Sequence, residues 1–300
     1  MNLSLDVNTE IYFFSNENFY ILYSGTSLHE EEDAFRHLND LYLMLLMLLQ
    51  KGVTKDNILL VIDLDILHHL DTKTKGKLIN DLKIKDFLEI STSSILDIND
   101  FPNQYIRDVN KDLIFISSGH GSIHGLYNSK NDSYLSSDYF EDIATVKKRT
   151  ILLMSQCIAG SFHHLDTRKN ICTIGASEYQ NSLSLDLLPL CKIFGGNANS
   201  MANSLSFFPG VAINPFLFSF FCVSLHTDVL LRYNSKKNLI HIYKYTASST
   251  YSYLQNVQNK IDFELIQHRD GKTFVRSGYM NVIQTPYLLN KILASNIIFS

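Results

Sequence analysis

Short apolar runs, each closed by small or polar residues, recur along the first two thirds of the chain. Counted with the turns that end them, they occupy residues 19–24, 58–62, 113–121, 151–161 and 170–177. Runs of this length that are rich in Ile, Leu and Phe are typical of buried strands in a parallel sheet. We therefore expect an α/β fold with a mainly parallel central sheet.

Three further segments predict helices or buried core elements. Leu, Met, Phe and Ala dominate residues 34–50, and Lys51-Gly52 places a Gly just past the end of this predicted helix. Residues 137–146 are a second helical segment, within the crossover between two strands. Residues 211–225 are strongly apolar but contain Asn214 and Pro215. Because a membrane span needs roughly 18–20 apolar residues, we expect this last segment to be a buried core element.

Two of the strand-ending turns carry a reactive side chain. The first reads Ser117-Ser118-Gly119-His120-Gly121, and the second reads Ser155-Gln156-Cys157-Ile158-Ala159-Gly160. Because the carboxyl ends of parallel strands meet at one edge of a sheet, His120 and Cys157 should emerge side by side. A free thiol has a pKa of about 8.5 and is mostly protonated at neutral pH. A neighbouring imidazole can act as its general base, so the two turns predict a nucleophile–base pair.

Composition narrows the class of protein. An apolar fraction of 45% with 19% charged residues is ordinary for a globular protein, and a net charge of −4 gives no basic footprint for nucleic acid. The four cysteines show no CxxC spacing, and we expect Cys172, Cys191 and Cys222 to be buried structural thiols. Residues 1–24 lack the basic region of a secretory signal. We expect a cytoplasmic location, with delivery to another cell left open.

The His-Gly turn, followed by a strand that ends in Cys-x-x-Gly-Ser, resembles the legumain-type cysteine peptidases of the caspase-like clan (clan CD). The segment Arg36-His37-x-x-Asp40 also matches a motif of that family. The resemblance covers about residues 19–184. It implies a caspase-like three-layer α/β/α sandwich and a catalytic dyad of His120 and Cys157. It also implies an oxyanion hole made by the backbone N–H groups of Gly121 and Cys157.

The resemblance further implies a pocket for the P1 side chain of a peptide substrate. Arg36 would read the P1 carboxamide or carboxylate, and Ala176 and Ser177 are candidate contacts at the end of the strand that walls the pocket. The chain departs from the family at two positions, with Ala34 in place of an Asn that hydrogen-bonds the catalytic His and Ser155 in place of an acid. Since the lost acid leaves the pocket more positive, we expect P1 preference to shift from Asn toward Asp.

No metal or organic cofactor is expected. The pairs His68-His69 and His163-His164 lack Cys, Glu or Asp ligands at suitable spacing, and Gly195-Gly196 lacks the Lys-Ser/Thr of a phosphate-binding loop. His124 follows His120 by four residues and would be the substitute base if His120 were structural.

The leading hypothesis is a single 1–300 peptidase domain that cleaves peptides or proteins after Asp or Asn. The alternatives are a catalytically silent caspase-fold interaction module, which Ala34 and Ser155 suggest, and a transpeptidase or ligase that uses the same acyl-enzyme. The sequence leaves open the natural substrate, zymogen activation, the oligomeric state and the role of residues 185–300, which complete the sheet or bind substrate. It also leaves open whether another residue replaces the missing Asn.

Overall fold

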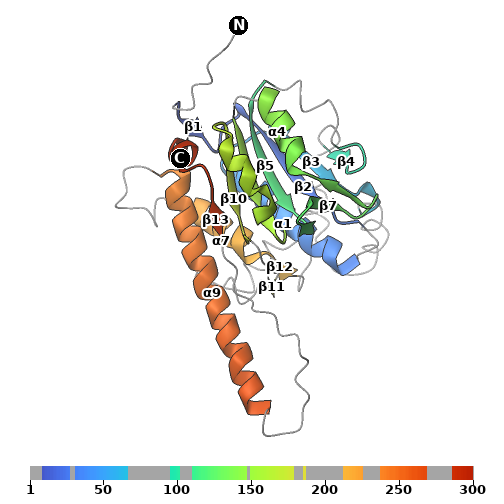
Figure 1. Ribbon diagram of the computed structural model, residues 1–300, viewed down its shortest axis with the longest axis vertical. Coiled ribbons are helices and arrows are strands. Elements are labelled where there is room, and N and C mark those ends of the chain that lie inside the picture. Colours follow the sequence, from blue (N-terminus) through green and yellow to red (C-terminus); the bar gives the residue numbers. More distant parts are fainter. Residues whose placement is uncertain are drawn as a thin grey trace.

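The central element of the fold is a mainly parallel sheet (Figure 1). The computed structural model describes residues 9–27, 31–66, 95–101, 110–146, 149–178, 185–186, 212–225, 237–268 and 286–299. Among these residues the sheet has seven strands in the order β13-β10-β9-β5-β2-β3-β4. The bounds are Asn18–Ser24 (β2), Ile58–Ile62 (β3), Ile95–Asp97 (β4), Asp112–Ser118 (β5), Thr150–Met154 (β9), Ile171–Gly175 (β10) and Tyr287–Leu288 (β13). Only β13 runs antiparallel to its neighbour, so the predicted α/β class is confirmed.

Helices cover both faces of this sheet. Side chains of β2 alternate, with Tyr20 and Leu22 in one core cluster and Phe19, Ile21 and Tyr23 in the other. The first cluster includes α1 (Glu31–Gln50), α7 (Pro215–Leu225) and α9 (Leu239–His268), and the second includes α4 (Ser137–Val146) and the 3-10 segment η4 (Ala159–Thr167). Because successive side chains of a strand point to opposite faces of the sheet, each strand contributes side chains to both cores. The result is the expected caspase-like three-layer sandwich.

Within the apolar segment 211–225, residues Pro215–Leu225 form the buried helix α7, in agreement with the expected core element. Asn214 caps its first turn, because the side-chain Oδ1 accepts hydrogen bonds from the backbone N–H groups of Phe216 and Leu217 at 3.0 and 3.2 Å. Pro215 then occupies the first helical position, where a missing N–H costs nothing. Helix α7 contacts both α1 and α9. No helix in the described part of the chain has the length and apolarity to cross a membrane.

Described residues from position 185 onward add strands and helices to the fold. Strand β13 pairs with β10 at the edge of the main sheet, and β14 (Ile297–Ile298) pairs with β1 (Ile11–Tyr12) near the N-terminus. The short helix α10 (Lys291–Ser295) precedes β14, and β11 (Leu185–Asp186) pairs with β12 (Ala212–Ile213). The long helix α9 runs along the sheet and extends beyond it (Figure 1).

A small antiparallel sheet, which the sequence did not predict, lies between β5 and α4 in the chain. It consists of β6 (Gly121–Ser122), β7 (Gly125–Asn128) and β8 (Ser133–Leu135). At the amino end of β3, the 3-10 turn η2 (Lys55–Asn57) leads directly into this strand. The small sheet begins directly after His120, so its placement also places the residues that follow His120.

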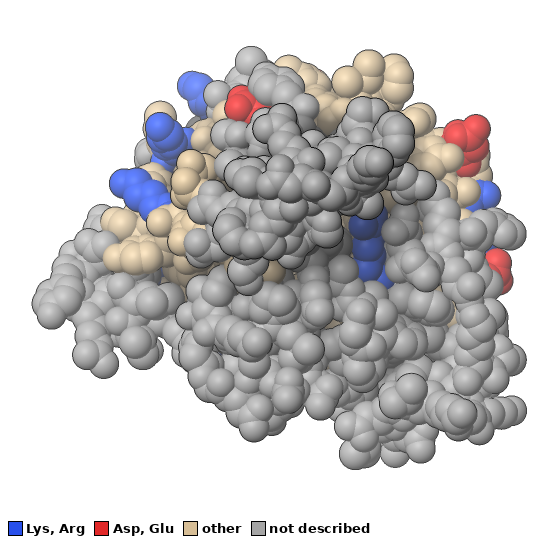
Figure 2. All heavy atoms as spheres, turned by 90° about the horizontal axis from the view of Figure 1, so that it is seen from below, with Lys and Arg blue, Asp and Glu red and all other residues tan. Residues whose placement is uncertain are grey.

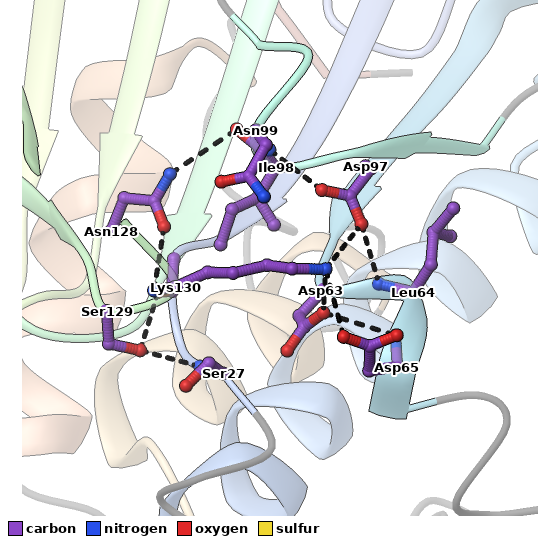
Figure 3. A network of polar contacts seen from close by, with 11 residues as sticks. Ser27, Asp63, Leu64, Asp65, Asp97, Ile98, Asn99, Asn128, Ser129 and Lys130 are labelled. Carbon is purple, nitrogen blue, oxygen red and sulfur yellow. Dashed lines mark hydrogen bonds and ion pairs between the residues drawn. The ribbon is translucent and has the colours of Figure 1, made fainter. Parts of the chain in front are cut away.

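Lys130, in the turn between β7 and β8, fastens the small sheet to the carboxyl edge of the main sheet (Figure 3). Its Nζ lies 2.7 Å from Asp63 Oδ1, 3.0 Å from Asp97 Oδ2 and 3.2 Å from Asp65 Oδ2. Beside it, the backbone N–H of Ser129 donates to the carbonyl of Gly25 at 2.8 Å. Three strand ends of the main sheet, those of β2, β3 and β4, are therefore tied to one turn.

We predict that Lys130→Met destabilises the fold by about 3 kcal/mol, because Asp63 is nearly fully buried and would lose its counter-charge. Burial raises the pKa of Asp97, but hydrogen bonds from Asn99 N–H, Lys130 Nζ and Leu64 N–H outweigh it and lower that pKa overall. The stabilisation from Asp97 is therefore present above the ordinary carboxyl pKa of about 3.9 and is lost as pH falls through its lower folded pKa.

Urea unfolding from pH 7 down to pH 3 measures this effect, with the exposed Lys55→Met as the matched control. The difference between the two variants should shrink as the pH becomes acidic. Equal unfolding midpoints for both variants at pH 7 would contradict the assignment of Lys130 as a structural clamp.

Candidate active site

The two predicted turns lie next to each other because their strands are paired. Strands β5 and β9 are parallel neighbours, with Ser117 opposite Met154. Beyond this pair, the backbone N–H and hydroxyl of Ser155 both donate to the carbonyl of Ser117, at 3.3 and 2.7 Å. The hydroxyl of Ser117 donates to Gln156 Oε1 at 2.8 Å. The turn that carries Cys157 is thus fastened to the end of the strand that leads to His120.

Gly121 brings the two turns into direct contact. A Cβ atom added at this position would lie 2.5 Å from the carbonyl oxygen of Cys157 and 2.4 Å from Cγ of Gln156. Only a residue without a side chain fits at that separation. His120 and Cys157 are both half-buried, and Cys157 is not part of a disulfide bond. The structure therefore brings the segments of His120, Gly121 and Cys157 together at one edge of the sheet.

The residue after Cys157 has an unusual backbone conformation. Ile158 has a φ of 52°, in the left-handed region that β-branched residues rarely adopt. Such a residue costs about 1–3 kcal/mol and persists only where the surroundings enforce it. Here the following turn is anchored, because the N–H of Gly160 donates to the carbonyl of Glu178 at 2.7 Å. The turn that holds Cys157 is consequently strained and fixed at both ends.

Behind His120 lies a buried polar chain that starts from α1. The His37 ring packs edge-to-face on the His120 ring, with centroids 5.4 Å apart. His37 Nδ1 lies 2.7 Å from the Ser118 hydroxyl, which donates to Asp40 Oδ2 at 2.7 Å. Asp40 Oδ1 accepts from the N–H of Asn214 at 2.7 Å. Burial lowers the pKa of the His37 imidazole, so this ring is neutral at neutral pH.

The predicted pocket residues come from three places in the fold, namely helix α1 and the segments that follow strands β9 and β10. Arg36 lies on α1, beside His37, and is half-buried with its Nε atom inside the protein. Ser177 follows β10 and is fully buried, next to the buried Ala176. Ser155 is also buried, and its hydroxyl is directed at the Ser117 carbonyl. Ser155 therefore contributes to the junction between the two turns. On the lower face of the molecule, a Lys or Arg side chain lies in a recess (Figure 2).

The other histidines have different surroundings. His124 is exposed and packs on the ring of Tyr134, with centroids 5.4 Å apart. His163 lies 3.6 Å from Glu178 Oε1 and packs edge-to-face on Tyr287. Within the described ranges, no three His, Cys, Asp or Glu side chains are grouped as a metal ion would require. His68-His69 lies outside the described residues.

Comparison with known proteins identifies the family. A model of the peptidase C13 family matches residues 18–184. The chain belongs to this family. Its members are cysteine peptidases of the legumain type, in clan CD, so the resemblance read from the two turns is confirmed. No curated protein matches the chain.

The C13 match covers the part of the chain that carries the candidate site. It begins at the start of β2, includes both turns and the Arg36-His37-x-x-Asp40 motif, and extends past Ser177. It ends before α7 and α9, which complete one layer of the sandwich. The family relationship therefore indicates cysteine-type peptidase chemistry in residues 18–184.

Sequence reasoning missed the polar chain of His37, Ser118, Asp40 and Asn214. A signal for three of its members was present, since His37 and Asp40 belong to the family motif and Ser118 precedes the Gly-His-Gly turn. Asn214 had no local signal, because it lies 174 residues from its partner Asp40.

Proposed function

We propose that this C13 family member is a cysteine endopeptidase in which His120 and Cys157 form the catalytic dyad. The observation that carries the proposal is the close approach of the two turns at Gly121, where a single added carbon would overlap the Cys157 backbone. A thiol outside any disulfide and an imidazole, carried on adjacent strand ends, are the pair of groups that nucleophilic acyl transfer needs.

The first half of the proposed reaction is acylation of Cys157. His120 takes the thiol proton, and Sγ attacks the carbonyl carbon of the scissile peptide bond. The oxygen of that carbonyl becomes negatively charged in the tetrahedral intermediate. The backbone N–H groups of Gly121 and Cys157 would stabilise it, each by about 3 kcal/mol in the transition state. His120 then returns the proton to the departing amine as the C–N bond breaks.

The second half is hydrolysis of the thioester. His120 takes a proton from water, and the resulting hydroxide attacks the acyl carbon while the same backbone N–H groups bind the oxyanion. When the C–S bond breaks, the proton passes from His120 to the Cys157 sulfur. The free carboxylic acid leaves and the enzyme regains its starting state, so no cofactor is consumed.

We further propose that the enzyme cleaves after Asp in preference to Asn. Arg36 is half-buried on the helix that also carries His37, where a guanidinium can meet a P1 carboxylate. Ser155 occupies the position at which the family places an acid, so that acid does not compete for Arg36. A charge-assisted hydrogen bond is worth about 1.5–3 kcal/mol, which corresponds to about a tenfold to hundredfold preference.

Cleavage of matched peptides that differ only in P1-Asp or P1-Asn tests both the activity and the preference. We predict that Arg36→Gln lowers kcat/KM for the Asp peptide about tenfold to hundredfold. Arg168→Gln is the matched control, because Arg168 pairs with Glu141 on the surface. A clear Asn preference of the wild-type enzyme would refute the specificity proposal, and absence of any cleavage after Asp or Asn would refute the activity.

A further inference from the structure

The imidazole of His37 touches the proposed catalytic His120 and is held from behind by buried groups. Its ring meets that of His120 edge-to-face, at a centroid separation of 5.4 Å and an interplanar angle of 80°. His37, Ser118 and Asp40 are 6%, 1% and 1% exposed, so water does not compete for their hydrogen bonds. From Asp40 this series of hydrogen bonds continues to the N–H of Asn214, which lies just before the start of α7.

The direction of these hydrogen bonds fixes the tautomer of His37. Asp40 is acceptor-only when ionised, and its Oδ2 takes the hydroxyl proton of Ser118. The Ser118 oxygen is then an acceptor toward His37, so the proton of the neutral ring sits on Nδ1. The remaining nitrogen, Nε2, carries a lone pair, is buried, and has no hydrogen-bond partner within the described residues.

The surroundings of His37 also determine the charge of its imidazole ring. Burial lowers the pKa of His37, and the positive charges of Arg36 and of protonated His120 lower it further, while Asp40 opposes them. In the described part of the protein, Arg36, His120 and Asp40 are the charged or titratable groups that shift the pKa of His37. A neutral His37 does not repel the imidazolium that His120 becomes when it takes the Cys157 proton, whereas a charged one would.

We infer that His37 is a positioning residue for His120, and that the Ser118–Asp40 pair sets its ring orientation and tautomer. The inference rests on the proposed dyad. It assigns the orienting role to His37, because its ring packs edge-to-face on that of His120. A base held by a second residue, itself oriented by a third, is the arrangement by which an imidazole is kept ready for proton transfer.

Two substitutions test the polar chain of His37, Ser118 and Asp40 in different ways. Ser118→Ala removes the hydroxyl that connects His37 to Asp40. Asp40→Asn keeps the shape but supplies an N–H where Oδ2 accepted, so that Ser118 donates to His37 Nδ1 and the ring proton moves to Nε2. Ser224→Ala is the matched control, because its buried hydroxyl has no hydrogen-bond partner among the residues described and lies at the far end of α7.

The measurement is the rate at which iodoacetamide alkylates Cys157 at pH 6.5, followed by peptide mass spectrometry on the full chain. At this pH an unpaired thiol is only about 1% thiolate, so fast alkylation reports the pairing with His120 without any peptide substrate. We expect wild type and Ser224→Ala to react fast. Ser118→Ala and Asp40→Asn should react about tenfold more slowly, and kcat on the peptide should fall about tenfold to hundredfold with KM nearly unchanged.

The outcomes distinguish absence of the dyad from absence of a positioning role for His37. If wild type reacts no faster than His120→Ala, the dyad itself is absent and the proposed function fails. If wild type reacts fast, His120→Ala reacts slowly, and both chain variants react like wild type, the dyad stands and His37 is not its positioning residue. Circular dichroism of each variant checks that a slow reaction does not come from an unfolded chain.

Discussion

We expect that replacing Cys157 by Ala abolishes peptide cleavage and that His120→Ala lowers kcat by at least about a thousandfold. The reason is that a Cys–His pair acts as a unit. Without the thiol no acyl-enzyme forms, and without the imidazole the thiol keeps its proton and the leaving amine receives none. Hydrolysis of a P1-Asp peptide, with released amine as the readout, measures both losses.

The matched control for the loss of a thiol is Cys222→Ala. Cys222 is buried in α7 and is not part of a disulfide bond, and replacing it by Ala deletes the same atom from the core. We expect this variant to lose some stability and to keep wild-type kcat at a temperature where it is folded. An active Cys157→Ala, or equal losses in the two cysteine variants, would contradict the assignment of the nucleophile.

The second large effect is expected from Gly121→Ala, which adds one carbon. That Cβ would lie 2.5 Å from the carbonyl oxygen of Cys157 and 2.9 Å from Cβ of Gln156, so backbone must move to admit it. Overpacking of this kind costs about 1–3 kcal/mol of stability. A displacement of about 1 Å between reacting groups can cost about a hundredfold in rate, and we expect kcat to fall by at least that factor.

Gly52→Ala separates the local effect from a general cost of losing a Gly. Gly52 has a φ of +83°, so Ala is strained there, but nothing lies within 4 Å of the added carbon. It should cost about 1–2 kcal/mol of stability and leave kcat unchanged. If Gly121→Ala is as active as Gly52→Ala, the two turns are not packed as described.

The parallel core of the fold was predictable because its strands are buried on both faces. A strand whose side chains are buried on both faces of the sheet has apolar residues at consecutive positions. This explains why the apolar run 58–62 coincides with β3. The helix α4 was predicted with its bounds, and the part of the apolar run 211–225 that forms α7 is a core element, as expected. The site followed from the same signal, since each predicted turn comes where an apolar run ends.

The small sheet and the C-terminal additions were not predictable from local pattern. Strands β6 and β13 have two residues each, too few for an alternating pattern to be recognised. No local pattern distinguishes Lys130 and its three carboxylates from ordinary surface charges, because the strand ends that bring them together are distant in sequence. The contact between Asp40 and Asn214 likewise depends on how α7 packs on α1.

The central claim, a working dyad of His120 and Cys157, is tested most directly by intact-protein mass after incubation with electrophilic peptide probes. Probes with Asp, Asn, Lys or Arg at P1 would be applied to wild type, Cys157→Ala and His120→Ala. We predict one adduct on wild type alone, formed fastest with the P1-Asp probe. An adduct of the same mass on Cys157→Ala, or none on wild type with any of the four probes, would contradict it.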